Sequence, residues 1–181
     1  MAVKFKTIEE SQVTISELML PSHTNFSGKI HGGYILSLLD QIAFACASKH
    51  SEAYCVTASV DTVDFLKPIE VGELVTMKAS INFTGNSSMI VGIRVEAENI
   101  QTGNVKHCNS SYFTMVAKDD QGKNVNVPGI IIRNKTELHR FHKSIKRIEL
   151  KKEREAHASS IHLTTDTTDI PDKYKVRIAI P

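Results

Sequence analysis

The sequence predicts an α+β domain in which an antiparallel sheet wraps around one long central helix. Three observations predict it. A single long apolar helix comes early in the chain, four strand candidates follow it in close succession, and the turns between those strands are short enough to require antiparallel pairing. With 181 residues, 41% of them hydrophobic, the chain has the size and composition of one globular domain with a sizeable core.

The expected elements follow one another along the chain. Residues 10–20 alternate well enough for a first strand, which Pro21 ends, and residues 21–32 form a polar loop. The long helix is expected over residues 33–49. After it, strands are expected at residues 54–66, 74–83, 89–99 and 105–118, separated by segments rich in turn-forming residues. Residues 125–132 are expected to form an apolar loop.

The helix is apolar on most of its circumference. Residues at helical spacing form the stripe expected to face the sheet: Ile35, Leu38, Leu39, Ile42 and Cys46. A helix of this kind must be covered on most sides, which one short sheet cannot do. A second copy of the chain is therefore expected to cover the rest, which makes the protein a dimer.

Asp40 is the unusual residue of this helix. It lies off the apolar stripe, and its neighbours three and four positions away are mostly apolar. The pattern predicts a buried carboxylate, which is costly unless it is paired, hydrogen-bonded or used in chemistry. From the helix alone, an aspartate held by a structural partner is as good an interpretation as a functional one.

The loop before the helix places polar groups close to its first turn. Asn25 and His31 lie in this loop, and Gly32 and Gly33 begin the helix. The first amides of a helix have no partner within it and carry the positive end of its dipole, so they can bind an anion or an oxyanion. Together with Asp40 these groups make a plausible acyl-transfer site. For His31 we favour a simpler interpretation, a loop histidine that hydrogen-bonds the backbone.

Three segments carry a family resemblance: the run from His31 to Asp40, residues 56–61 with Phe65 and Pro68, and residues 83–89. As a set they resemble the hotdog-fold acyl-CoA thioesterases, and most closely the cytosolic acyl-CoA hydrolase subgroup. The resemblance covers roughly residues 10–155. It implies a hotdog fold, hydrolysis of acyl-CoA to a free fatty acid and CoA, and a dimer that assembles further into a hexamer as a trimer of dimers.

The resemblance also implies roles for individual residues. Asp40 matches the family's catalytic carboxylate, which would act as general base on water or attack directly to form an anhydride. Asn25 matches the catalytic amide, and the N–H of Gly33 would face the thioester oxygen. The resemblance further implies that the amide and the carboxylate of one site come from opposite protomers.

Coenzyme A needs a polar channel, for which two segments are candidates. The turn at residues 84–88 offers backbone amides and hydroxyls for pantetheine or phosphate, although an ordinary hairpin turn explains it as well. Its residues are Thr84, Gly85, Asn86, Ser87 and Ser88. Residues 137–157 are predicted to form a basic helix with a thin apolar stripe at Leu138, Phe141, Ile145 and Ile148. Its charge pattern is typical of an ordinary surface helix, but Arg147, Lys151 and Arg154 could meet the nucleotide phosphates.

Composition narrows the remaining possibilities. A net charge of +2 is too even to imply nucleic acid or a membrane surface, and no apolar run reaches transmembrane length. Three cysteines without close paired spacing are expected to be reduced core thiols in a cytoplasmic protein, with neither a metal site nor a cofactor. Residues 1–157 are expected to form the domain, and residues 158–181 a polar tether that could add one more strand.

Two other functions fit part of the pattern. A hydratase acting on acyl thioesters is expected to carry a histidine opposite the carboxylate of the central helix, and residues 33–47 contain none. A non-catalytic acyl-CoA-binding sensor is expected to carry an output domain, for which the sequence shows no pattern. The preferred acyl chain length, and the choice between general-base and anhydride chemistry, stay open at this stage.

Overall fold

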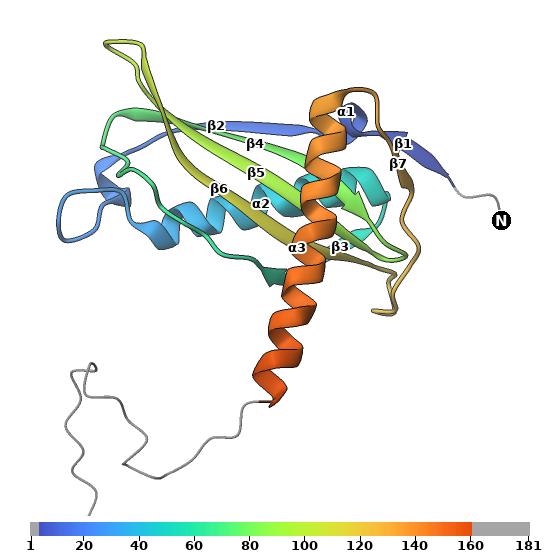
Figure 1. Ribbon diagram of the computed structural model, residues 1–181. Helices are drawn as coiled ribbons and strands as arrows, with labels where there is room; N and C mark the ends of the chain where they lie inside the picture. The colour runs from blue at the N-terminus through green and yellow to red at the C-terminus, as the bar shows by residue number, and fades with distance from the viewer. Residues whose placement is uncertain (1–3, 161–181) are drawn as a thin grey trace, which may run out of the picture. The chain divides into compact units, whose positions relative to one another are not determined.

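A computed structural model describes residues 4–160 of the chain, which divides into two compact units, Met1–Ile145 and Lys146–Pro181. Figure 1 shows the first unit as a curved sheet with helix α2 (Gly32–Ser51) lying across one face. The strands are β2 (Val13–Leu18), β3 (Tyr54–Val60), β4 (Glu73–Thr84), β5 (Ser88–Asn99) and β6 (Asn104–Lys118). They lie in the order β2-β4-β5-β6-β3, and every neighbouring pair is antiparallel. The predicted α+β architecture is confirmed.

The strand expected over residues 54–66 is too long. Strand β3 ends at Val60. Beyond it the chain bonds to β6 only at intervals: the N–H of Asp61 donates to the carbonyl of Tyr112 and the N–H of Leu66 to the carbonyl of Cys108, both at 2.9 Å. Further along, the carbonyl of Asp64 accepts a hydrogen bond of 2.9 Å from the side chain of Asn109. Because a side chain satisfies this backbone group, the segment needs no continued ladder.

Helix α2 is covered by the sheet on one side only. All five residues of the predicted stripe are buried, with exposed fractions between 0 and 8%. They belong to one core cluster with sheet residues that include Met77, Val91 and Met115. On the opposite side Leu36 and Phe44 are each 39% exposed. The expected core-facing stripe is therefore confirmed, and an open apolar face remains.

Short elements at the periphery were not predicted. Residues 8–11 form helix α1 (Ile8–Ser11) and not the start of a strand, because Thr7 and Glu10 build a capping box, a signal that the sequence does contain. The apolar loop expected at residues 125–132 includes strand β7 (Gly129–Ile131), which pairs in parallel with β1 (Phe5–Thr7). A 3₁₀ turn, Pro21–His23, follows β2.

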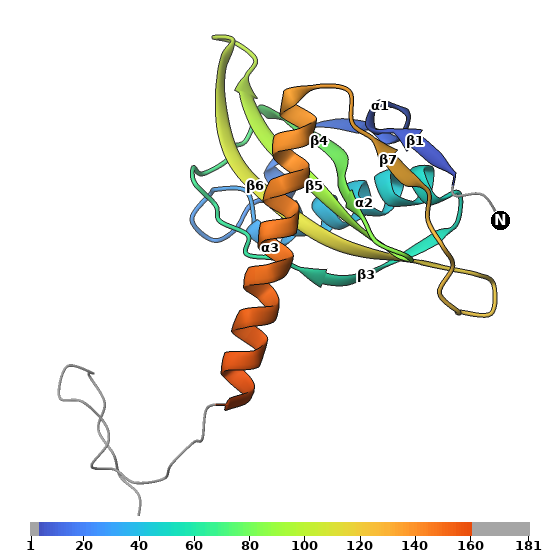
Figure 2. The same ribbon diagram turned by 45° about the vertical axis from the view of Figure 1, so that its right-hand side comes forward.

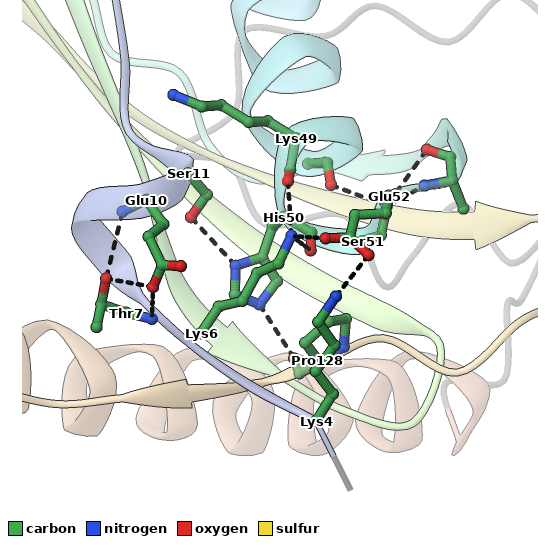
Figure 3. Close-up of polar contacts among 12 residues, drawn as sticks. Lys4, Lys6, Thr7, Glu10, Ser11, Lys49, His50, Ser51, Glu52 and Pro128 are labelled. Atoms are coloured by element: carbon green, nitrogen blue, oxygen red, sulfur yellow. Dashed lines mark hydrogen bonds and ion pairs between the residues drawn. The ribbon is translucent and has the colours of Figure 1, made fainter.

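Polar contacts fasten these peripheral elements to the C-terminal end of α2 (Figure 3). His50 is fully buried there; its Nε2 donates to the carbonyl of Pro128 at 3.0 Å, and its Nδ1 lies 3.1 Å from the hydroxyl of Ser11. The ammonium of Lys6 donates to the carbonyl of His50 at 2.9 Å and pairs with Glu52 at 2.8 Å. Burial lowers the pKa of His50, which keeps the imidazole neutral.

The basic helix expected over residues 137–157 is confirmed as α3 (Lys135–Ser160). Within the first unit, its Phe141 ring stacks on Phe83 with centroids 5.8 Å apart, and Lys143 lies 5.9 Å from the centroid of the Tyr112 ring. Figure 2 shows this stretch on the face of the sheet opposite α2. Of the predicted stripe, Leu138 is 42% exposed. The polar tether expected over residues 158–181 begins too early, because α3 continues to Ser160. The rest of that segment, with its possible extra strand, lies at residues 161–181, outside the described residues.

Candidate active site

Asp40 lies on the open face of α2. The prediction of a buried carboxylate is wrong for the single chain, in which Asp40 is exposed. The sheet covers only the stripe through Leu39 and Ile42, so positions 36, 40 and 44 point away from it. Asp40 therefore sits between Leu36 and Phe44, in an apolar neighbourhood that residues 4–160 leave open.

Thr57 of strand β3 holds the Asp40 carboxylate. Its hydroxyl donates to Oδ1 of Asp40 at 2.6 Å, and the same hydroxyl lies 3.4 Å from the sulfur of Met115. Within residues 4–160, Oδ2 of Asp40 accepts no hydrogen bond, so one oxygen is anchored and the other faces the open side. The sequence analysis gave Thr57 no role. Its only signal was a hydroxyl on an edge strand, which does not reveal a contact seventeen positions away.

A cleft of about 510 Å³ adjoins this carboxylate. It is lined by Asp40, Gln41, Phe44, Tyr54, Cys55, Val56 and Thr57. The rings of Phe44 and Tyr54 meet edge to face with centroids 5.6 Å apart, and Tyr54 is 62% exposed. The cleft thus combines one acid with an apolar, partly aromatic wall.

Asn25 stands in a tightly tied loop that closes with a bridge between Thr24 and Ile30. Its Oδ1 accepts three hydrogen bonds, from the N–H of Ser27 at 2.9 Å, the hydroxyl of Ser27 at 2.7 Å and the N–H of Lys29 at 3.2 Å. The acceptor oxygen of the amide is therefore used within the loop. The NH₂ group is left as the functional end, which can only donate.

A single chain does not bring Asn25 and Asp40 together. Asn25 precedes the first turn of α2, whereas Asp40 lies eight residues beyond Gly32, about 12 Å along the helix axis. Asn25 borders a different cleft of about 370 Å³, with Ile35 and Phe65, that shares no residue with the Asp40 cleft.

The amide of Gly33 has a partner within the chain. Its N–H donates to Nδ1 of His31 at 2.9 Å, so His31 caps the helix and the interpretation of this histidine is confirmed. A Cβ at position 33 would lie 3.0 Å from the His31 ring, which explains the glycine there. The Gly33 amide can meet a thioester oxygen only if the imidazole moves aside.

The predicted CoA-binding residues lie in two separate places. The turn at residues 84–88 joins β4 to β5: the N–H of Gly85 donates to the carbonyl of Ser88 at 2.8 Å, and the carbonyls of Asn86 and Ser87 accept from Val127 and Ala117. Arg147, Lys151 and Arg154 belong to the second unit, at a helical spacing that places them on one face of α3. The side chain of Lys151 lies 4.0 Å from Glu155.

Residues 4–160 contain no group of three His, Cys, Asp or Glu side chains that could hold a metal ion. All three cysteines are buried, and burial raises the pKa of Cys46 to about 12. No helix of this part of the chain is long and apolar enough to cross a membrane.

Comparison with known proteins identifies relatives of this chain among thioesterases. The model of the "Thioesterase superfamily" matches residues 27–104. Protein VdlD of Helicobacter pylori is 41% identical over 145 residues, which is 80% of this chain and 83% of that protein. The "uncharacterized acyl-CoA thioester hydrolase YkhA" of Bacillus subtilis is 33% identical over 84% of this chain and 89% of its own length. The human cytosolic acyl coenzyme A thioester hydrolase is 31% identical over 84% of this chain, which spans 41% of the human protein.

Solved structures with the same fold are also similar in sequence. A hexameric acyl-CoA thioesterase matches with a TM-score of 0.83 and 35% identity, over 85% of this chain and 99% of that one. The acyl-CoA hydrolase of Staphylococcus aureus, solved with butyryl coenzyme A, coenzyme A and coenzyme A disulfide, matches with a TM-score of 0.79 and 33% identity, over 86% and 94%. Structures of three variants of this enzyme also match, in which an asparagine, an aspartate or a threonine is replaced by alanine. The aspartate follows the asparagine by 15 positions, and the threonine follows the aspartate by 17.

Proposed function

The chain belongs to the thioesterase superfamily, and we propose that it hydrolyses the thioester of acyl-CoA to a free fatty acid and CoA. The observation that carries this proposal is the Asp40 carboxylate, anchored through one oxygen by Thr57 at 2.6 Å and open through the other to a half-apolar cleft. An acid beside an apolar wall suits a substrate whose reactive carbonyl carries an alkyl chain.

The spacing of three residues supports this assignment. Asn25, Asp40 and Thr57 are separated by 15 and 17 positions, the same separations as the asparagine, aspartate and threonine replaced in the Staphylococcus aureus enzyme. Thr57 therefore joins the two predicted side chains as a third member of the site. Its role is to position Asp40, because its hydroxyl is bound to the carboxylate.

In the general-base form of the reaction, Asp40 takes a proton from water while the water oxygen attacks the thioester carbon. The negative charge that develops on the carbonyl oxygen needs donors. When the tetrahedral intermediate collapses, the C–S bond breaks and the CoA thiolate takes up the proton that Asp40 removed from water, which restores the carboxylate. The anhydride form replaces water by the carboxylate oxygen in the first step and uses water in the second.

Asn25 is the donor that this site offers to the carbonyl oxygen. Because its own oxygen already accepts three hydrogen bonds within the loop, the amide is held in place and its NH₂ group is left to donate. A donor fixed before the substrate arrives costs no reorganisation during the reaction. The Gly33 amide is a second donor, which the substrate reaches by displacing the ring of His31.

The complete site is shared between two chains. Asn25 and Asp40 border different clefts of one chain, and the open face of α2 leaves Leu36 and Phe44 without a cover. A dimer that pairs these faces brings the Asn25 loop of one protomer to the partner subunit's Asp40 and removes the apolar surface from water. We further propose that three such dimers form a hexamer, as the structural relatives named hexameric do.

The CoA moiety extends from this shared site. The turn at residues 84–88 is proposed to contact pantetheine through its hydroxyls and remaining amides, and the cationic face of Arg147, Lys151 and Arg154 to bind the nucleotide phosphates. We also propose that the protein is located in the cytoplasm. Its three cysteines are buried free thiols, and burial raises the pKa of Cys46 and Cys108, as expected in a reducing compartment.

Thiol release from acyl-CoAs ranging from acetyl to palmitoyl tests the proposed function directly. We expect free CoA to appear with at least one chain length, at a rate proportional to enzyme concentration. Hydration of an enoyl-CoA, followed on the same samples, tests the hydratase alternative. Tight binding of acyl-CoA without release of thiol from any substrate would instead identify a binding protein and overturn the proposal.

Complementation tests the shared site. Asn25→Ala and Asp40→Ala are each expected to be inactive; unfolded and refolded together in equal amounts, they should recover about a quarter of wild-type activity. Half of the dimers are then mixed, and each mixed dimer holds one intact site, because the two-fold axis places both defects in the other site. Mixed dimers without activity would show that both residues act within one chain.

A further inference from the structure

Phe26, at the tip of the Asn25 loop, is the most exposed large hydrophobic residue among residues 4–160. Its exposed fraction is 114%, above that of an extended reference peptide, whereas the next values are near 60%. A phenylalanine left in water forgoes the favourable transfer of its whole ring. Such a residue is a strong candidate for an anchor that becomes buried in an assembly.

The loop presents this ring in a fixed position. The N–H of Asn25 donates to the carbonyl of Lys29 at 2.7 Å, and the N–H of Gly28 donates to the carbonyl of Asn25 at 3.0 Å. Gly28, with φ +77°, makes the tight turn, and an ion pair of 2.7 Å joins Lys29 to Glu70. Because these bonds hold the backbone on both sides of Phe26, ordering the ring on binding costs little entropy.

The shared site determines where this ring goes. Consecutive Cα atoms lie about 3.8 Å apart, so a loop that delivers Asn25 to the partner subunit's Asp40 carries Phe26 to the same cleft. That cleft has an apolar side one helical turn beyond Asp40, where the Phe44 and Tyr54 rings meet edge to face. A third aromatic ring can pack on such a pair, and pairs of this kind contribute beyond the area they bury.

We propose that Phe26 of one protomer enters the Asp40 cleft of its partner, packs beside Phe44 and Tyr54, and closes the acyl end of the site. This inference rests on the proposed function and adds a determinant of substrate chain length to it. The acyl chain lies beside the Phe44 and Tyr54 rings, because the α2 residues that line the cleft, Asp40, Gln41 and Phe44, extend from Asp40 toward the C-terminal end of the helix. The size of residue 26 then sets how many methylene groups fit.

The test is the ratio of kcat/KM for octanoyl-CoA to that for butyryl-CoA. Replacing Phe26 with Ala removes the wall and should raise this ratio at least tenfold, since each additional buried methylene group is worth about fourfold. Phe26→Trp fills more of the cleft and should lower the ratio. Phe5→Ala serves as the matched control, because Phe5 is another exposed phenylalanine, 57% exposed, on the peripheral strand β1.

A double variant locates the ring. If Phe26 packs beside Phe44, then Phe44→Ala should raise the ratio as well, and the two changes together should give less than the product of the single effects. Sedimentation of each variant checks that the dimer persists; if Phe26→Ala dissociates it, Phe26→Leu keeps an apolar anchor and should still raise the ratio severalfold.

An unchanged ratio, or an equal loss of kcat for both substrates, would overturn the inference, because Phe26 would then only support Asn25. If the wild-type enzyme hydrolyses acyl-CoA and the Phe26 variants keep its chain-length profile, only this inference fails. Wild-type enzyme that releases no thiol from any acyl-CoA would remove the proposed function itself.

Discussion

The two ends of helix α2 differ in whether their polar groups are satisfied within the chain. At the C-terminal end, His50 is fully buried and both ring nitrogens contact protein atoms, while Lys6 caps the last carbonyls and pairs with Glu52 (Figure 3). Toward the N-terminal end, the helix begins with two glycines, and the carboxylate of Asp40 faces an open cleft. The C-terminal end around His50 is therefore tied to the rest of the chain, whereas the half of the helix that carries Asp40, the open end, leaves a carboxylate oxygen available.

The contrast indicates a division of labour. Buried polar groups that are fully satisfied stabilise one arrangement of the chain, and they offer a ligand nothing to bind. A carboxylate oxygen on an uncovered face, such as Oδ2 of Asp40, is available to a substrate at some cost in stability. Changes at the two ends should therefore separate, with activity lost at one end and stability lost at the other.

The largest expected effect is at the open end. Asp40→Asn should reduce kcat for thiol release by about a hundredfold or more, because it removes the base or nucleophile and keeps the shape of the side chain. The melting temperature should stay the same or rise. Asp120→Asn, in an exposed turn, is the matched control and should retain activity. Full turnover by Asp40→Asn would remove Asp40 from the mechanism.

At the tied end, the loss should appear in stability. His50→Leu leaves the carbonyl of Pro128 without its donor and should lower the free energy of unfolding by about 1–3 kcal/mol. The kcat of the folded enzyme should change less than twofold. Denaturant unfolding measures the first quantity and thiol release the second. His142→Leu, at an exposed histidine, is the control. An equal loss of unfolding free energy in this control would show that the buried contacts of His50 do not stabilise the fold specifically.

Thr57 should show a smaller effect on activity than Asp40. Thr57→Val keeps the shape of the side chain and removes the hydroxyl that binds Oδ1 of Asp40, so kcat should fall about tenfold with little change in KM. Thr57→Ser keeps the hydroxyl and should restore most of the rate. Equal activity of the Val and Ser variants would mean that the contact does not position the carboxylate.

The tied end should also respond to pH. Burial lowers the pKa of His50 below its usual value near 6.5, so the unfolded state binds the proton more readily than the folded state. This contribution to stability is complete above about pH 6.5 and declines as the pH falls toward the lowered pKa. Unfolding free energies at pH 7.5 and 5.5 should therefore differ more for the wild type than for His50→Gln. Parallel pH profiles would contradict this account.

The smallest effect should come from Glu52. Its hydrogen bonds with Lys4 and Lys6 lower its pKa to about 2, yet the carboxylate is exposed and solvent screens both pairs. Its stabilising contribution is present above about pH 4.5 and is lost as the pH falls toward 2. Glu52→Gln should lower the melting temperature only slightly at pH 7, and the difference from wild type should vanish near pH 2. A large loss at pH 7 would place this pair among the main supports of the helix end.

Local pattern was sufficient for the architecture. The stripe through Ile35, Leu39 and Cys46 faces the core as predicted, because helical spacing alone decides which side chains share a face. Short turns decided the antiparallel order of β4, β5 and β6. The prediction of Asn25 and Asp40 as site residues depended on the family resemblance and on polar residues in an apolar setting, and no contact could be inferred for either.

Tertiary structure decided the surroundings of each group. The sequence predicts that Asp40 is unusual, but only the curvature of one sheet over one side of α2 leaves it exposed beside a cleft. Thr57 meets Asp40, and His50 meets Pro128, across 17 and 78 positions of chain. Spacing along a chain sets which residues share an element; which elements meet depends on how the whole core packs, and that is why the anchored carboxylate and the buried histidine appear only in the folded protein.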